Sequence, residues 1–552
     1  MLSYRKLAMR VLGRPLHTGG NDSPRPASQR AAAFALTAAM LITLAAPAFA
    51  ETWYIENGDI TVKASGTEGK NKVSQGNNPE VEDTDTIITN SNKNTASSHT
   101  VTIEANGKND KVEVTLKDVN IDTSSRNNAA VSVTGSGNTT IKLDGDNHLA
   151  GGNGIYSNSS GSLTISGDEN DSLTAQGGDS RNGIYSVSGD VTISGGTVTA
   201  TGGNSTDSVG SGGRGIYSVS GDVTISGGTV NANGGDGKNG SDGGDGISSD
   251  SLTISGGTVT TKGGSGDDGG SGVLIYSNGS LTVSGGTVTA NGGNSGGIFN
   301  GGRGISSYGG VTVSGGTVNA NGGDSEDGDG GSGIFSFDRV AISGGTVEAA
   351  GGVGKNGSGG SGIYSSGIDL SGSLELTAKA GSPNGKALSQ NGKELDLDTI
   401  NKDKLDPGAK VTTTDADGKV IKQVSIPRPV EPEKPVIPEE SSSSSDGGSS
   451  APSASVSSLP GLTVTDKSGA VISYTSTQSG NTLTVCVGRF TASLHASLSA
   501  LRQLRAEGIE TITFQTILCS TTLSVDELLA MGGEDAEAVL THRLTDSSLT
   551  VG

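Results

Sequence analysis

One segment of the chain is repeated almost letter for letter. Residues 183–203, GIYSVSGDVTISGGTVTATGG, recur 32 residues later as GIYSVSGDVTISGGTVNANGG. The isoleucine after the first glycine marks eight such units, spaced by 28 to 32 residues. These isoleucines are Ile155, Ile184, Ile216, Ile247, Ile275, Ile305, Ile334 and Ile363. A repeat of this length indicates an array in which each unit packs on the next.

Apolar and polar residues alternate within a unit. Val191, Ile193, Val198 and Ala200 are separated by serine, threonine and glycine. Alternation with period two predicts β-strands with one buried face. Each unit then holds three short strands joined by glycine-rich corners, and stacked units supply hydrogen bonds above and below every strand. The sequence predicts an all-β fold, a parallel β-helix with one coil per unit of about 30 residues.

Composition supports this architecture over the alternatives. The 552 residues include 92 glycines and only 17 aromatic residues, which excludes a core built on large side chains. A propeller needs four strands per blade and larger residues between blades. A collagen-like rod needs glycine at every third position, and these glycines lack that period.

The sequence on either side of the repeats divides the chain into further segments. We expect irregular first coils over 51–150, eight regular repeats over 151–381, and a cap over 382–425 that covers the open sheet edge. Residues 426–460 are rich in proline, charge and serine, which predicts an extended linker.

Residues 461–552 predict a small α/β or α+β domain. Strands are expected at 461–465, 481–487 and 511–518, and a helix from about Thr491 to Glu507. Cys486 and Cys519 fall in the strands that flank this helix, where they form either a disulfide or two free core thiols.

The first fifty residues have the pattern of a secretory signal. Basic residues precede the apolar run AAAFALTAAMLITLAAPAFA, which ends in the small-x-small triplet Ala48-Phe49-Ala50. The alternative is a membrane anchor, for which the run is short. No second long apolar stretch follows, so we expect a secreted, extracellular protein without a transmembrane anchor, retained at most on the cell surface.

Charge excludes nucleic acid as a partner. The whole chain carries −21, and the first fifty residues hold six basic residues and one acidic residue, so cleavage after Ala50 leaves −26. Such a chain repels a phosphate backbone.

The residue after each marker isoleucine is expected to face outward, because neighbours on a strand point to opposite faces. Most of these positions are aromatic: Tyr156, Tyr185, Tyr217, Tyr276, Phe335 and Tyr364, interrupted by Ser248 and Ser306. An exposed aromatic column suits sugar rings, so these six residues are candidate carbohydrate-binding residues. Alternatively, the rings stack on one another between coils and hide their faces.

The sequence predicts a second column at the glycine-rich corners that follow the third strands. Six of seven corners carry Asp or Asn at the sixth place, counted from the first glycine of the corner, including Asp207, Asn239 and Asp268. Oxygen ligands on tight turns suit Ca²⁺, whereas Asx side chains also bond turn backbone without any metal. The candidate metal ligands are Asp267, Asp268, Asp324, Glu326, Asp327 and Asp329.

Catalysis is the less favoured interpretation. Asp267 and Asp268 are similar to the paired carboxylates of β-helical polysaccharide hydrolases, but acidic corners recur in nearly every coil, which indicates a lattice rather than one active site. No histidine lies between His148 and His495. Arg181, Arg214 and Arg303 precede the first strands of their units, where they either meet an acidic sugar or serve solubility.

Three further segments carry a family resemblance: the strand VTLKDVNI at 114–121, the turn LDGDNHL at 143–149, and GSLTISGDENDSLTA at 161–175. With the expected mature start TWYIENGDITV, they resemble the calcium-associated β-helical carbohydrate-binding domain of secreted bacterial proteins. The resemblance covers about residues 52–380. It implies a right-handed β-helix that binds cell-wall polysaccharides, acidic ones bridged by calcium, and no catalysis.

The sequence thus leads to a secreted, non-catalytic carbohydrate-binding protein whose partner is a plant or microbial cell-wall polysaccharide. One alternative is a surface stalk or adhesin whose partner protein binds 461–552. A second alternative is a polysaccharide lyase.

Overall fold

The computed structural model describes residues 51–427 and 462–551, apart from 68, 207–209, 239, 467–469, 473, 480, 488, 490, 517–519, 532–535 and 544–545. The predicted signal peptide, nearly all of the predicted linker, Cys519, Asp207 and Asn239 lie outside the described residues. The chain forms two compact units, divided between Pro432 and Glu433.

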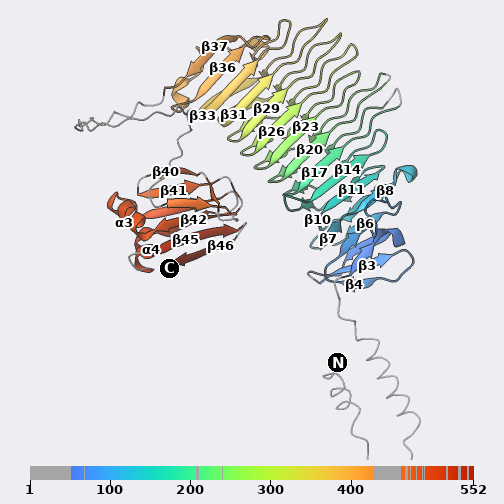
Figure 1. The fold of residues 1–552 in the computed structure, drawn as a ribbon. Helices are drawn as coiled ribbons and strands as arrows, with labels where there is room; N and C mark the ends of the chain where they lie inside the picture. The colour runs from blue at the N-terminus through green and yellow to red at the C-terminus, as the bar shows by residue number, and fades with distance from the viewer. Residues whose placement is uncertain are drawn as a thin grey trace, which may run out of the picture. The chain divides into compact units, whose positions relative to one another are not determined.

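The first unit is a parallel β-helix, so the predicted fold class is confirmed (Figure 1). A typical coil consists of β15 (Ile184–Ser186), β16 (Val191–Ile193) and β17 (Thr197–Thr201), the three strands expected per unit. Each strand pairs in parallel with its counterpart in the next coil. Backbone groups are therefore satisfied between coils.

The first strands of successive coils form a 15-stranded sheet. Its members are β2 (Ile60–Ala64), β6 (Val101–Ala105), β9 (Val131–Gly135), β12 (Ile155–Ser159), β15, β18 (Ile216–Ser218), β21 (Ile247–Ser249), β24 (Val273–Ile275), β27 (Ile305–Ser307), β30 (Ile334–Ser336), β32 (Ile363–Ser365) and β34 (Leu388–Gln390), with β3 (Asn71–Gln75), β4 (Val81–Asp83) and β35 (Lys393–Glu394) at the ends.

The second and third strands form a 22-stranded sheet. Its second strands are β1 (Thr52–Tyr54), β5 (Ile87–Thr89), β7 (Lys111–Lys117), β10 (Asn138–Asp144), β13 (Leu163–Ser166), β16, β19 (Val223–Ile225), β22 (Leu252–Ile254), β25 (Leu281–Val283) and β28 (Val311–Val313). Its third strands are β8 (Asn120–Asp122), β11 (Asp146–Gly151), β14 (Ser172–Gly177), β17, β20 (Thr229–Asn233), β23 (Thr258–Lys262), β26 (Thr287–Asn291) and β29 (Thr317–Asn321). The strands β31 (Arg339–Ala350) and β33 (Gly367–Lys379) run through both positions and are followed by β36 (Lys410–Thr414) and β37 (Val420–Ser425).

The interior is a narrow apolar core along the length of this unit. Val191, Ile193, Val198 and Ala200 are all fully buried, as their alternation predicts. They belong to one cluster of buried side chains that extends from Trp53 to Val424. Each fully buried valine or isoleucine contributes about 1.5–3 kcal/mol, so stability is summed coil by coil.

Glycine is required at the bend between second and third strands. Gly228 has a φ of +77°, and a Cβ there would lie 2.4 Å from the carbonyl oxygen of Gly196 in the preceding coil. The same bend recurs at Gly196, Gly257 and Gly286, all with positive φ. Only glycine combines this backbone conformation with such close stacking.

Antiparallel pairing closes both ends. β3 pairs antiparallel with β2 and β4 at one end, while β35 pairs with β34 and β37 with β36 at the other. Three short 3-10 helices, η1 (Ile55–Asn57), η2 (Ser124–Arg126) and η3 (Lys402–Lys404), lie in the connections. These hairpins cover strands that would otherwise present a free parallel edge.

The register predicted for the repeat that contains β24 is wrong by two residues. β24 pairs Val273 with Ile247 and with Ile305, so Val273, not Ile275, is the counterpart of the marker isoleucines. Ile275 instead pairs with Ser249 and Ser307. Both Val273 and Ile275 are fully buried, because residues two apart share a face. The predicted face was right and the predicted register was wrong.

The second unit contains two sheets and two helices. The five-stranded sheet consists of β38 (Leu462–Thr465), β39 (Val471–Ile472), β42 (Thr491–Ser497), β45 (Glu537–Arg543) and β46 (Asp546–Val551). The four-stranded sheet consists of β40 (Thr475–Ser479), β41 (Thr482–Cys486), β43 (Thr511–Gln515) and β44 (Ser520–Ser524). The helices are α3 (Leu498–Ala506) and α4 (Val525–Met531). The expected small mixed domain is thereby confirmed, and Cys486 is a free thiol.

Only the second part of the helix predicted over 491–507 is helical in the structure. Its first part is β42, in which the alternate residues Ala492, Leu494 and Ala496 are buried, and this strand lies between β38 and β45. α3 begins only after Ser497, whose hydroxyl accepts a hydrogen bond from the Ala500 backbone N–H.

None of the helices in the described ranges is both long and apolar enough to span a bilayer.

Candidate functional site

A column of tyrosines stands on the outer face of the 15-stranded sheet. Tyr156, Tyr185 and Tyr217 are register partners on β12, β15 and β18, and each is half-buried. The rings of Tyr185 and Tyr217 are stacked, with centroids 5.3 Å apart and planes 9° apart. The rings of Tyr156 and Tyr185 lie 5.5 Å apart and are tilted by 44°. Faces inside this column are therefore covered by neighbouring rings, and burial raises the pKa of Tyr185.

Tyr276 does not stand in this column. Leu274 occupies the column position of that coil, between Ser248 and Ser306. The Tyr276 ring meets Tyr217 edge-on at 6.1 Å, and its hydroxyl donates to the carbonyl oxygen of Ser218, two coils away. Its side chain therefore crosses the intervening coil, and burial raises the pKa of its hydroxyl.

A second aromatic group lies further along the same sheet. Phe335 and Tyr364 are register partners with stacked rings 5.1 Å apart. Tyr308 and Phe337, which sequence analysis missed, join them: their centroids lie 4.9 Å apart, and Phe337 meets Phe335 edge-on at 4.8 Å. Both follow column residues by two positions, so the period-two pattern was the signal that places them outward.

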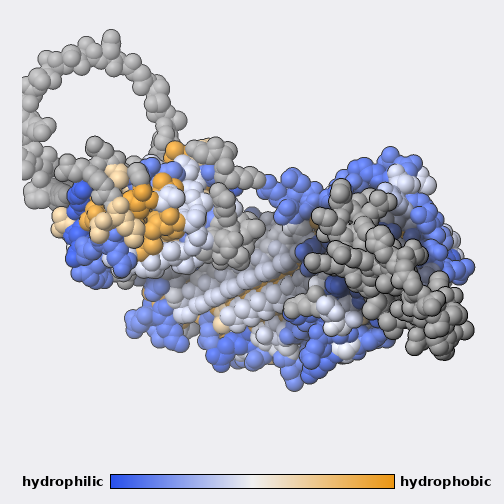
Figure 2. Space-filling model, turned by 90° about the horizontal axis from the view of Figure 1, so that it is seen from below, coloured by the Kyte–Doolittle hydropathy of each residue, from blue (hydrophilic) through white to orange (hydrophobic). Residues whose placement is uncertain are grey.

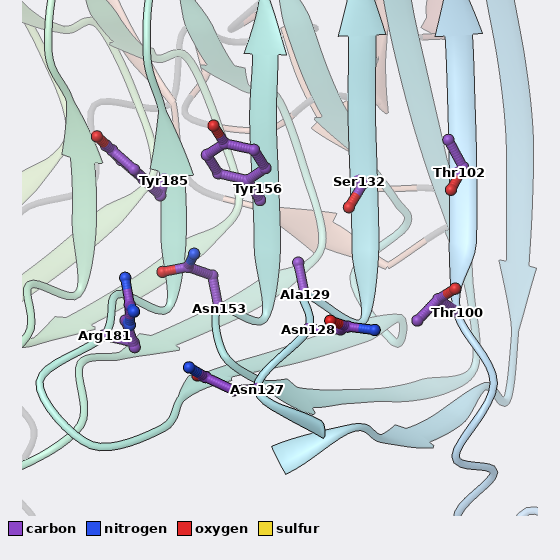
Figure 3. Close-up of a pocket in the computed structure, with 10 residues that line it drawn as sticks. All are labelled: Thr100, Thr102, Asn127, Asn128, Ala129, Ser132, Asn153, Tyr156, Arg181 and Tyr185. Carbon is purple, nitrogen blue, oxygen red and sulfur yellow. The ribbon is translucent and has the colours of Figure 1, made fainter. Parts of the chain in front are cut away.

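The tyrosine column ends in a groove. The register partner of Tyr156 on β9 is Ser132, and the next residue of the column is Thr102 on β6. Above these short side chains lies a groove of about 500 Å³. Figure 3 shows the Tyr156 ring beside Ser132 on the neighbouring strand, with Thr102 on the strand beyond Ser132. The face of Tyr156 that points away from Tyr185 therefore meets open space rather than another ring.

Polar groups complete the groove. Asn153 lies below Tyr156, and its Oδ1 accepts a hydrogen bond from the Asn182 backbone N–H at 3.0 Å, which leaves the amide NH₂ as a donor at the groove (Figure 3). Arg181 is exposed beside Tyr185, and Asn127 and Asn128 line the groove from the connection that precedes β9 (Figure 3). No carboxylate occurs among the described residues that line the groove.

Asp59 fixes the edge of the groove from outside. Its Oδ1 accepts hydrogen bonds from the backbone N–H of Thr100, at 2.8 Å, and lies 3.2 Å from His99 Nδ1. Burial alone would raise the pKa of Asp59, but these hydrogen bonds outweigh it and hold the pKa below its ordinary value. The carboxylate thereby holds Thr100, a groove residue, in place at neutral pH.

The acidic corners do not form the column that the sequence predicted. Residues at the sixth place fall in different spatial rows, because coil lengths vary: Asn182 accepts from the Arg214 backbone N–H, whereas Asp268 donates its N–H to Asp242. Regular ladders do form at the third place, where Asn204 accepts from Asp236, and Asp236 from Ser265. These side chains bond the backbone of the next coil.

The candidate cluster around Asp324 is used in the same way. Asp324 accepts from the Val353 N–H, Asp327 from the Asn356 side chain and Asp329 from the Ser358 N–H. Glu326 forms an ion pair with Lys355 at 2.6 Å. Each carboxylate thus already bonds the following coil. In the ranges that the structure describes, no group of three or more His, Cys, Asp or Glu side chains is placed to hold a metal ion.

Asp268 belongs to a charged cavity rather than to a pair with Asp267. The cavity, of about 290 Å³, is lined by Asp242, Asp245 and Asp268 together with Arg214 and Arg303. Asp267 is not among the residues that line this cavity. The cavity walls and the nearby Asp242 raise the pKa of Asp268, while Arg303 opposes the shift.

Arg214 and Asp245 form a partly buried ion pair in this cavity. Arg214 Nε lies 3.0 Å from Asp245 Oδ2, and Asp245 Oδ1 accepts from the Ser271 N–H at 2.9 Å. The Arg214 guanidinium also lies 4.3 Å from the centre of the Tyr217 ring. Burial raises the pKa of Asp245, although Arg214 and Ser271 favour its charged form.

Comparison with known proteins supports the fold alone. A family model described as a beta helix repeat matches residues 191–216, 223–247 and 311–334. No curated protein and no solved structure matches the sequence. The matched segments fall within the regular coils, and the matches and the observed coils together identify a parallel β-helix protein.

Proposed function

We propose that this protein is a secreted, non-catalytic carbohydrate-binding protein, and that the groove beside Tyr156 receives a sugar ring of a cell-wall polysaccharide. The observation that carries the proposal is the end of the tyrosine column at Ser132. A sugar ring placed over Ser132 would continue the stack, with its C–H face on the open face of Tyr156.

The remaining groove residues suit the edge of a sugar. Asn153, Asn127 and Asn128 offer amide groups, and Thr102 and Ser132 offer hydroxyls, all around one aromatic face. A few convergent polar groups beside an aromatic wall are typical of a small-ligand site. Over most of the visible face of the β-helical unit, residues are hydrophilic or near-neutral (Figure 2).

Arg181 points to acidic polysaccharides as the preferred class. It is the one charged residue among the described groove residues, on a chain whose net charge would otherwise repel an anionic polymer. Calcium enters the proposal as a bridge between such a polymer and surface carboxylates, in the way that the family resemblance implies.

Binding to an array of plant and microbial polysaccharides tests the proposal. The chain 51–552 is applied with calcium and with a chelator, and retention is compared between the wild type, Tyr156→Ala and Tyr54→Ala. Tyr54 is an exposed tyrosine of the other sheet and serves as the matched control. We expect Tyr156→Ala alone to lose retention. Silence of the wild type across the array would reject the proposal, and unsaturated products that absorb in the ultraviolet would favour the lyase alternative.

The division into two units favours a second candidate function. The unit that contains 462–551 has its own buried cluster, with Phe514, Leu501 and Leu494 among its members. A stalk or adhesin would use it to bind a partner protein. Removal of 461–552 separates the two functions: glycan binding survives under the first proposal, and all partner binding disappears under the second.

A further inference from the structure

The second aromatic group presents an open face of its own. Tyr308 is 51% exposed and Phe337 55% exposed, and their rings are in contact. They lie on the outer side of the sheet that carries the Tyr156 groove, two residues beyond the column positions Ser306 and Phe335. Because the chain has only 17 aromatic residues, two half-exposed rings side by side are unlike its ordinary surface.

Beside Tyr308 lies a guanidinium without an ion-pair partner. Arg303 stacks on Phe335 at 3.9 Å and donates one hydrogen bond, at 3.5 Å, to Ser306 Oγ. No carboxylate of the described residues lies within 4 Å of it, in contrast to Arg214 in the same cavity, which Asp245 pairs at 3.0 Å. Burial lowers the pKa of Arg303. A partly buried cation with five donors and one long hydrogen bond calls for acceptors from a ligand.

The cavity offers acceptors as well as donors. Asp242 and Asp268 line it together with both arginines and Asp245, so that two arginines and three aspartates leave one net negative charge. This negative charge would repel a carboxylate ligand. A sugar hydroxyl, by contrast, both accepts a hydrogen bond from Arg303 and donates one to Asp268. The adjoining face of Tyr308 suits the C–H face of the same ring.

We propose that Tyr308, Arg303 and Asp268 form a second sugar-binding site, selective for an uncharged sugar unit of the same polysaccharide chain that occupies the groove at Tyr156. This inference rests on the proposed function. Because the first groove has no lining carboxylate and contains Arg181, the two sites together select a polymer in which acidic and neutral units both occur.

The spacing of the two sites sets the length of ligand that is required. From Ser132 to Ser306 the column advances six register steps on one sheet, or about 29 Å at about 4.8 Å per step. A short oligosaccharide occupies one site at a time. A chain long enough to lie along the column engages both, and the second contact becomes intramolecular.

The test compares long and short ligands by calorimetry with the chain 51–552. The ligands are a polysaccharide retained on the array and a short oligosaccharide from the same polymer. The variants are Tyr308→Ala and Arg303→Lys. Arg502→Lys, at an exposed arginine of α3, is the matched control for the arginine, and Tyr54→Ala is the control for the ring. Circular dichroism and thermal unfolding confirm that each variant is folded.

We expect Tyr308→Ala and Arg303→Lys to weaken binding of the long polymer at least 10-fold, because each variant loses part of the gain of about 100-fold or more that two linked sites provide. In both variants, the affinity of the Tyr156 groove for the short acidic oligosaccharide stays unchanged. The two control variants bind both ligands with the affinity of the wild type. Unchanged affinity of Tyr308→Ala for the long polymer, while Tyr156→Ala still weakens the short ligand, would overturn the second site alone. Loss of all binding by the wild type would instead overturn the proposed function.

Discussion

Tyr156 and Ser132 are register partners on neighbouring parallel strands, and at this step the column changes from a large ring to a short hydroxyl. Farther along, the same column repeats tyrosine against tyrosine at Tyr185 and Tyr217, and those faces are covered. The regular part of the repeat therefore stabilises the fold, while its interruption leaves a surface open. Within this column, Tyr156 therefore has a ring face available to a ligand, whereas the facing rings of Tyr185 and Tyr217 cover each other.

The stacked glycines provide the first prediction. Gly228→Ala should destabilise the β-helix strongly, because its Cβ would lie 2.4 Å from the Gly196 carbonyl oxygen at a φ of +77°. Gly66→Ala is the control, since Gly66 has the same φ of +77° with nothing within 4 Å of the added Cβ. Strain at positive φ alone costs about 1–2 kcal/mol. Urea unfolding should show a clearly larger loss for Gly228→Ala, and equal losses would contradict the close stacking.

The ion pair of Arg214 with Asp245 provides the second. Asp245→Ala leaves the Arg214 guanidinium and the Ser271 N–H without their partner. We therefore expect the free energy of unfolding to fall by about 3–5 kcal/mol. Glu326→Ala breaks the exposed pair with Lys355 and should change stability by less than about 1 kcal/mol. Chemical denaturation measures both losses. Similar values for the two variants would show that Asp245 is solvated in the native state.

Asp268 provides a pH-dependent prediction. Partial burial and the neighbours Asp242 and Asp245 raise its pKa in the folded state, against Arg303 and the Gly269 N–H, which lower it. The folded state then binds this proton more tightly than the unfolded state, so the contribution of Asp268 to stability falls as pH rises from its unfolded pKa through its folded pKa. Asp268→Asn should raise the melting temperature slightly at neutral pH, and the gain should vanish in acid below both pKa values. A gain that persists in acid would assign it to something other than ionisation.

Calcium removal provides the fourth. Asp324, Asp327 and Asp329 already accept hydrogen bonds from the following coil. We therefore expect a chelator to leave the melting temperature unchanged, while it reduces retention on acidic polysaccharide if calcium bridges polymer and protein. A fall in melting temperature that added calcium reverses would establish a structural ion site at these corners.

The period-two pattern was sufficient to predict the coil but not every register. In the segment SGVLIYS, both Val273 and Ile275 suit the inner face, and the similarity of IYS to the other repeats favoured the wrong one. The backbone pairing of Val273 with Ile247 and Ile305 decides the matter. Tyr276 consequently leaves the column and bonds Ser218. Sequence similarity and backbone register differ here because corners of unequal length precede the strand.

Tertiary pairing also decided the start of α3. Leu494, Leu498, Leu501 and Leu504 have helical spacing, whereas Ala492, Leu494 and Ala496 have strand spacing. Two flanking strands, β38 and β45, bind residues 491–497 in the extended form. A local pattern that fits both periods cannot show which neighbours the chain will meet. The charged cavity was missed for a similar reason, since Asp242, Asp268 and Arg303 come from three coils.

The most direct test of the account is calorimetric titration of the chain 51–552 with a polysaccharide retained on the array, using wild type, Tyr156→Ala, Ser132→Tyr and Tyr54→Ala. Tyr156→Ala removes the stacking face, and Ser132→Tyr fills the groove by extending the column by one ring. We predict that both weaken binding by about 10-fold, the effect of losing one aromatic contact of about 1.5 kcal/mol, while Tyr54→Ala binds like the wild type. Wild-type affinity in both groove variants would contradict the claim that the open face of Tyr156 holds the sugar.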